Sequence, residues 1–110
     1  MENFHEQATA WRALATKPAL PEGLKAYFVL AEQAIKNHEP EEALNDYELG
    51  VESYPMWPGG WYNAALAAGD LGYYADAAEE MQNYLELTPN APDAQTARAY
   101  MEGWKIKAGK

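Results

Sequence analysis

The sequence predicts an all-α protein, a single domain of about six helices arranged as antiparallel helix hairpins. Three observations lead to this prediction. First, 110 residues that are 48% hydrophobic are enough for one buried core and too few for two. Second, apolar residues recur three and four positions apart, which is the spacing of one face of an α-helix. Third, the chain resembles itself when it is shifted by 34 residues, and such a period is typical of stacked helical repeats.

The first expected element is an N-terminal helix within residues 3–16. Phe4, Ala8 and Trp11 fall on one side of this helix. The segment Lys-Pro-Ala-Leu-Pro follows as a stiff connector, because each proline disfavours helix in the residue before it. Two roles stay open for this helix: it belongs to a degenerate leading repeat, or it caps the domain.

The first expected repeat spans residues 24–57 and consists of two helices. The first helix is predicted over Gly23–Asn37 and the second over Glu41–Ser53, which ends before Pro55. Pro40 separates them, since proline is excluded from a helix interior but suits a helix start. The residues predicted to face the core are Tyr27, Leu30, Ala31, Ala34, Ile35, Ala43, Leu44, Tyr47 and Val51.

The second expected repeat spans residues 58–91 and follows the same plan. Helices are predicted over Gly60–Leu71 and Tyr74–Leu87, the second ending before Pro89. Gly72 lies between them, where a tight turn needs the left-handed backbone that glycine adopts most readily.

Two further segments complete the domain. Trp57-Pro58-Gly59-Gly60 is interpreted as the turn that joins the two repeats. Residues 92–108 are predicted to form a C-terminal capping helix, Pro92–Lys107, because a stack of repeats needs a closing element with a polar outer face.

The 34-residue period also carries a family resemblance. The shift aligns Tyr27 with Trp61, Ala31 with Ala65, Ala34 with Ala68, Ala43 with Ala77, and Pro55 with Pro89. Together with Gly72, Tyr74 and Met81, these positions resemble the tetratricopeptide repeat (TPR) family over residues 24–91. Three positions depart from the family pattern: His38 replaces the turn glycine, and Gly50 and Tyr84 stand where alanine is usual.

The resemblance implies a function in protein–protein interaction. Members of the family bind a peptide or helix of a partner in a concave groove that the first helix of each repeat lines. Carried over by position, the groove residues are Lys25, Phe28, Val29, Glu32, Tyr62, Asn63, Leu66, Asp70, Thr96 and Tyr100. An alternative is that the N-terminal helix folds into this groove and buries these side chains.

The charge distribution limits the classes of partner that can be expected. Seventeen acidic and eight basic residues give a net charge of −9, which disfavours nucleic acid because phosphate binding needs Lys and Arg. Between residues 37 and 97 there are twelve acids and no Lys or Arg. The expected partner is therefore a neutral to basic peptide with apolar anchors. Chaperone tails, which are acidic and which some family members bind, are disfavoured because Glu32 and Asp93 occupy positions of the clamp that holds them.

Catalysis, metal binding and cofactor binding are not expected. The chain has two histidines, one serine and no cysteine, and none of them stands in a nucleophile or metal-ligand motif. It also lacks the spaced oxygen ligands of a calcium loop. The acids of the second helices are expected on the solvated convex face, and they are Glu41, Glu42, Asp46, Glu48, Asp76, Glu79 and Glu80.

Self-association is the main alternative function. Two full repeats are fewer than the three or so that a stable stack needs, so that pairing of two chains or a place in a larger assembly would complete the core. No apolar run approaches the roughly 20 residues of a membrane span, and the first residues do not resemble a signal peptide. We therefore expect a cytoplasmic protein without a membrane span.

Overall fold

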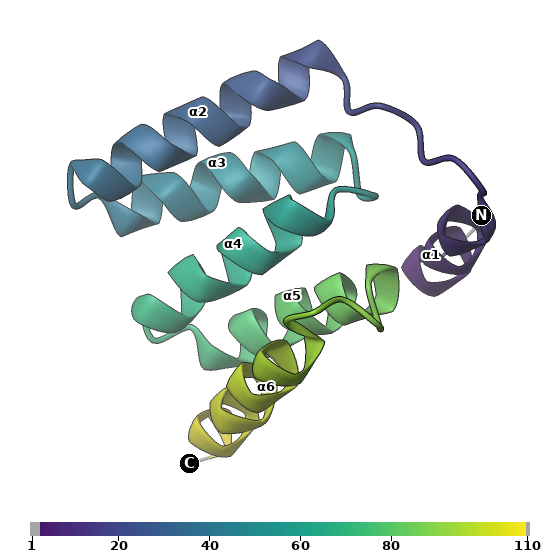
Figure 1. The fold of residues 1–110 in the computed structure, drawn as a ribbon. Coiled ribbons are helices and arrows are strands. Elements are labelled where there is room, and N and C mark those ends of the chain that lie inside the picture. Colours follow the sequence, from purple (N-terminus) through teal and green to yellow (C-terminus); the bar gives the residue numbers. More distant parts are fainter. Residues whose placement is uncertain (1–2, 110) are drawn as a thin grey trace.

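The computed structural model describes residues 3–109, and in that range the chain forms six α-helices and no strand. The predicted all-α class, with about six helices, is confirmed (Figure 1). The helices are α1 (Phe4–Ala13), α2 (Glu22–Lys36), α3 (Pro40–Ser53), α4 (Pro58–Asp70), α5 (Tyr74–Leu87) and α6 (Ala94–Ala108).

Local chemistry explains the starts of three helices, α1, α3 and α4. The side chain of Asn3 caps α1 by accepting a hydrogen bond from the backbone N–H of Glu6 at 2.9 Å. Pro40 and Pro58 occupy the first positions of α3 and α4, where a missing N–H costs no hydrogen bond. These two helices therefore begin one and two residues earlier than the sequence analysis predicted.

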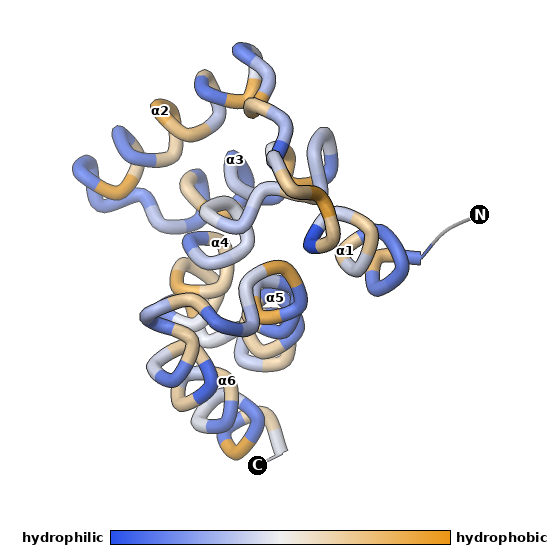
Figure 2. Tube along the Cα trace, turned by 45° about the vertical axis from the view of Figure 1, so that its right-hand side comes forward, coloured by the Kyte–Doolittle hydropathy of each residue, from blue (hydrophilic) through white to orange (hydrophobic). Residues whose placement is uncertain are grey.

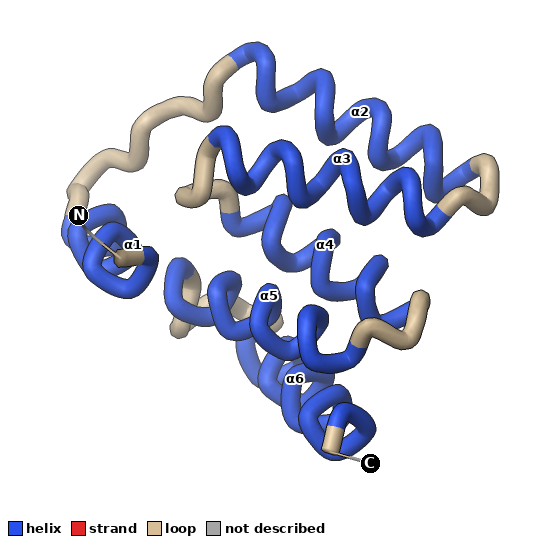
Figure 3. The backbone as a smooth tube through the Cα atoms, turned by 180° about the vertical axis from the view of Figure 1, so that it is seen from behind, coloured by secondary structure: helices blue, strands red, loops and turns tan. Residues whose placement is uncertain are grey.

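Helices α2 to α6 pack in chain order, each against the next. The result is a stack with α2 at one end and α6 at the other (Figure 1). Helix α1 does not continue this order. An extended connector carries it along the side of the stack, and it packs on α5, as the view from behind also shows (Figure 3).

The two hairpins close with the same hydrogen bonds, 34 residues apart. In the first, the N–H of Glu39 donates to the carbonyl of Ala34 at 2.8 Å, and in the second the N–H of Tyr73 donates to the carbonyl of Ala68 at 2.9 Å. The residue before each donor has a positive φ, 59° at His38 and 85° at Gly72. These features define a Schellman turn, which satisfies carbonyls that a helix end leaves without partners. The internal period therefore reappears in three-dimensional geometry.

His38 is expected to be a weak point of the first turn, because a left-handed backbone is strained for any residue with a Cβ atom. Replacing His38 with glycine should raise the free energy of unfolding by about 0.5–1 kcal/mol. Replacing Gly72, whose added Cβ would meet open space, with alanine should lower it by about the same amount. Urea denaturation of both variants checks this pair, and two changes of the same sign would contradict it.

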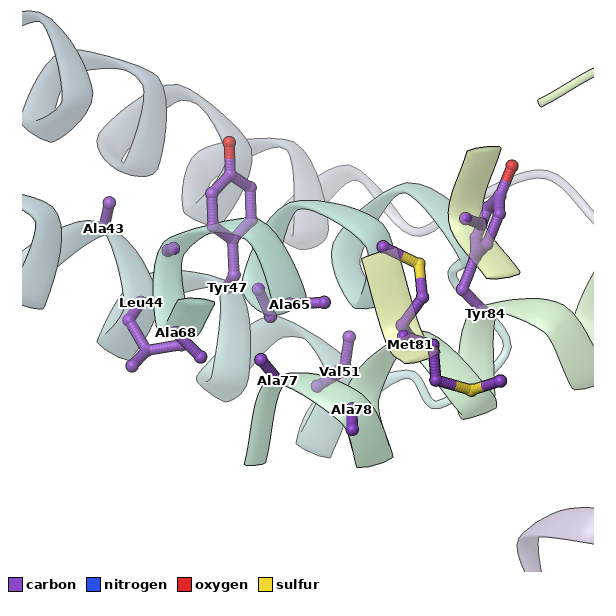
Figure 4. Packing of buried hydrophobic residues seen from close by; sticks show 14 of the residues in the cluster. Ala43, Leu44, Tyr47, Val51, Ala65, Ala68, Ala77, Ala78, Met81 and Tyr84 are labelled. Carbon is purple, nitrogen blue, oxygen red and sulfur yellow. The ribbon is translucent and has the colours of Figure 1, made fainter. Parts of the chain in front are cut away.

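Small residues let the stacked helices approach closely. Ala31, Ala43, Ala65 and Ala77 are fully buried, and each occupies the same place in its repeat as one of the others. Larger side chains fill the spaces between them, including Met81, which is also fully buried (Figure 4). The predicted alanine contacts are thus part of one continuous core.

Two predictions about burial were wrong. Leu30 and Ile35, expected in the core, are 51% and 48% exposed because α3 is the one helix that packs extensively on α2. Asp46 and Glu80, expected on a solvated face, are buried between helices. The turn predicted over Trp57-Pro58-Gly59-Gly60 is wrong in its extent, because Pro58 is already the first residue of α4 and Trp57 is its N-cap. The Trp57 ring is a buried core side chain.

Candidate functional site

A cavity of about 370 Å³ opens between α2 and α4, with α3 contributing to its wall. Its lining comes from the first helix of each hairpin and one residue of the helix between them. The lining residues are Glu32, Ile35 and Lys36 from α2, Tyr47 from α3, and Asn63, Leu66, Ala67 and Asp70 from α4.

Four of the residues predicted from the sequence meet in this cavity: Glu32, Asn63, Leu66 and Asp70. They come from helices whose first residues lie 36 positions apart, so only the packing of the hairpins brings them together. Residues four apart on α4 share one helix face, which explains why Leu66 and Asp70 line the same wall.

The lining side chains are held by local contacts. The side-chain amide of Asn63 donates to the carbonyl of Gly59 at 2.8 Å, which leaves its oxygen as an acceptor. Burial, and secondly the charge of Glu32, raises the pKa of Tyr47, so its hydroxyl keeps its proton and can donate a hydrogen bond. The cavity thus presents an acceptor, a donor and the apolar side chain of Leu66.

Negative charge dominates the rim of the cavity. The lining contains two acidic residues, Glu32 and Asp70, and one basic residue, Lys36. Asp70 is also the last residue of α4, whose final turn contains no basic side chain to offset the negative end of the helix dipole. A cationic group placed there would be attracted by the carboxylates and by the helix terminus together.

An aromatic cluster occupies the next junction, where α4, α5 and α6 meet. Tyr62 packs edge-on against Tyr84, with ring centroids 5.0 Å apart. The hydroxyl of Tyr84 donates to Asp93 at 2.5 Å. Burial, followed by the charge of Asp93 and the proximity of Tyr100, raises the pKa of Tyr62. Burial and the hydrogen bond to Asp93 are the main causes that raise the pKa of Tyr84.

Tyr100 and Thr96, also predicted for the groove, lie at a second hollow of about 380 Å³ on α6. Tyr100 is 43% exposed and stacks on Trp104, with ring centroids 5.4 Å apart. The predicted groove residues therefore divide between two places, one at α2 and α4 and the other along α6.

The remaining predicted residues lie outside the lining of the first cavity. Phe28 lies one helical turn before Glu32 on α2. The centroid of its ring is 6.5 Å from that of Tyr47 and 6.4 Å from that of Trp57. Lys25 forms an exposed ion pair with Glu22 at 3.2 Å, and Val29 points away from the stack with half of its surface exposed.

The N-terminal helix leaves the cavity open. Its Phe4 packs edge-on against Trp61, with ring centroids 5.5 Å apart, and Arg12 donates to the carbonyl of Glu86 on α5. His5 lies 2.7 Å from the carboxylate of Glu86. Within the described range, α1 contributes no lining residue to the cavity, so the alternative in which this helix fills the groove is not the arrangement found.

Sequence reasoning missed four lining residues: Ile35, Lys36, Tyr47 and Ala67. Ile35 and Tyr47 had been assigned to the core by their apolar spacing. A signal for Ile35 and Lys36 was available, because they lie three and four residues after Glu32 and so share its helix face. Tyr47 could not be found in this way, since it comes from the other helix of the hairpin.

The fold defines the class of molecule: an all-α stack of helical hairpins. No protein-family model matches the chain, and no curated protein shows significant similarity to it. None of the helices within residues 3–109 is long and apolar enough to cross a bilayer. In the same range, no three His, Asp or Glu side chains gather in a way that could hold a metal ion.

Proposed function

We propose that the chain is a TPR-like, non-enzymatic interaction module that binds a short basic segment of a partner protein in the cavity between α2 and α4. The observation that carries the proposal is the meeting of Glu32, Asn63, Leu66 and Asp70 in one open cavity. The repeated turn geometry supports the family assignment, because the same hydrogen bonds recur 34 residues apart.

The chemistry of the lining defines the expected ligand. A Lys or Arg side chain of the partner would lie between Glu32 and Asp70, and an apolar side chain would pack on Leu66 and Ile35. The free oxygen of the Asn63 amide would accept a hydrogen bond from the peptide backbone. The volume of about 370 Å³ suits one or two side chains rather than a whole helix.

The proposal is tested by titrating isotope-labelled protein with two short peptides. One combines Lys with Leu and Ser, and the other has Glu in place of each Lys. The Lys peptide is expected to shift the NMR signals of Asn63, Leu66 and Asp70, and to bind less tightly as salt screens the charges. The Glu peptide is expected to leave these signals unchanged.

Removing the two acids should weaken binding of the Lys peptide. The double variant Glu32→Gln with Asp70→Asn is expected to raise its dissociation constant by about 3- to 10-fold, given a few tenths to one kcal/mol for each exposed ion pair. Glu52→Gln is the matched control, because Glu52 is exposed on α3 and does not line the cavity. Equal affinity for both peptides, or no effect of the double variant, would reject the proposal.

A further inference from the structure

The outer side of α2 is an uncovered apolar surface at one end of the stack. Helix α2 packs mainly on α3, whereas α3, α4 and α5 each pack between two others. Two of its large apolar side chains on this side, Val29 and Leu30, are 50% and 51% exposed, whereas Phe28 and Ile35 lie toward the peptide cavity. Figure 2 shows hydrophobic segments along this helix at the edge of the molecule.

This edge is also hollowed. A cavity of about 530 Å³ lies along it, and Ala26, Tyr27 and Leu30 of α2 and Tyr54 beyond α3 contribute to its wall. None of the described residues that line it is charged. The wall includes Gly23, and a Cβ atom there would meet open space, so another helix could approach closely at this point.

We propose that this edge, comprising Gly23, Ala26, Val29, Leu30 and Tyr27, binds α2 of a second copy of the chain in an antiparallel, two-fold arrangement. Formation of this dimer does not require peptide binding, although Lys36 belongs to both sites. Burial of Val29, 50% exposed, and Leu30, 51% exposed, would supply the apolar contacts. A two-fold contact uses the same patch on both copies, so it closes as a dimer.

The charges on α2 are complementary to those of a second α2 helix that runs antiparallel to it. Glu22, Val29 and Lys36 are spaced by seven residues, so they lie along one stripe of α2. An antiparallel pair centred near Val29 places Glu22 opposite the partner's Lys36, and Lys36 opposite the partner's Glu22. A parallel pair would instead place like charges opposite each other.

The rest of the molecule is compatible with this arrangement. Helix α2 carries two acids and two bases, so its net charge is zero although the chain as a whole carries −9. Glu32 and Ile35, which line the peptide cavity, lie on the opposite flank of α2 from Ala26 and Leu30. Lys36 is the one lining residue that would also contact the partner in the dimer, so the space between Glu32 and Asp70 would stay open.

Sedimentation velocity of the full chain over a range of concentrations tests the dimer. The wild type is expected to shift toward twice its monomer mass of 12.3 kDa as concentration rises. Leu30→Glu should raise the dissociation constant at least tenfold. Ile106→Glu, the same kind of change at a 64% exposed site on α6, should leave it unchanged. Circular dichroism verifies that both variants remain folded.

Charge reversal tests the antiparallel geometry directly. Glu22→Lys alone and Lys36→Glu alone should each weaken the dimer, because each places like charges opposite one another. The double variant should restore the dimer, since the two charges are then exchanged. A monomer at all concentrations would overturn the proposal, and so would a dimer that Leu30→Glu leaves intact or single reversals that the double variant does not rescue.

Discussion

Replacing Trp57 with alanine is expected to lower the free energy of unfolding by about 3–5 kcal/mol, the range for truncating a large buried aromatic side chain. The ring is 6% exposed and lies at the junction between the two hairpins. Its centroid is 6.2 Å from that of Tyr47 and 6.4 Å from that of Phe28. The loss would therefore weaken contacts of α2 and α3 at the same time.

The same ring explains why position 50 is a glycine. A Cβ atom added to Gly50 would overlap Cζ3 of Trp57, and its next neighbours would be Cε3 of Trp57 at 3.1 Å and Leu24 at 3.4 Å. Gly50→Ala is therefore expected to cost about 1–3 kcal/mol of stability in the wild type. Once Trp57 is alanine, the same change should instead add up to about 1 kcal/mol, because alanine favours helix more than glycine.

A double-mutant cycle measured by urea denaturation checks this reversal of sign. Gly103→Ala is the control, since Gly103 is also helical and has no neighbour within 4 Å of an added Cβ. It should be mildly stabilising in both backgrounds. If Gly50→Ala changed the stability equally with and without the Trp57 side chain, overlap with this ring would not be the reason that position 50 requires glycine.

The second large effect is expected at Glu80, a buried carboxyl on α5. It is 6% exposed, and its Oε1 has no hydrogen-bond partner. Burial is the main cause that raises its pKa from 4.5 to about 9, and a hydrogen bond with Glu48 on α3 is the next. The charges of Glu48, Asp76 and Glu79 act in the same direction. Near neutral pH the folded protein therefore keeps Glu80 protonated.

Stability should consequently fall as pH rises. Below about pH 4.5 Glu80 is protonated in both states, and its contribution is fully present. Between about pH 4.5 and 9 the unfolded chain ionises while the folded chain does not, so unfolding releases a proton, and by about pH 9 the contribution is lost. The free energy of unfolding should drop by about 2–4 kcal/mol from pH 5 to pH 8 through this group, at up to about 1.4 kcal/mol per pH unit.

Glu80→Gln should remove this dependence, because glutamine resembles the protonated acid in shape but does not ionise. The variant is expected to match the wild type near pH 4.5 and to be more stable at pH 8. Glu79→Gln, a change at an exposed neighbour on the same helix, should retain most of the pH dependence. Denaturation at several pH values decides the question, and parallel profiles of Glu80→Gln and wild type would refute the assignment.

Much of the fold could be predicted because its information is local. The positions of helices depend on apolar spacing, and their ends depend on residues such as Pro40 and Gly72 that favour one backbone geometry. The internal period located His38 as the counterpart of Gly72, and both residues adopt a positive φ. Each of these features involves residues that are close in the chain.

The candidate site could be predicted only in part. Glu32 and Asp70 were assigned to one groove by position in the repeat, and they do line one cavity. Tyr100 belonged to the same predicted groove but lies at a separate hollow on α6. Whether side chains from successive repeats face one space depends on the angle between the hairpins, which the spacing of residues does not specify.

The sequence alone determined the helices, their turns and the small residues at which they meet, because these follow from backbone preference and helical periodicity. Only the tertiary structure decided that α1 packs on α5 and leaves Leu30 exposed. It also decided that Trp57 occupies the space beside Gly50 and that Glu80 is buried near Glu48. The physical reason is that burial is a property of neighbours across space. The same apolar or acidic residue is solvated or buried according to which distant segment packs against it.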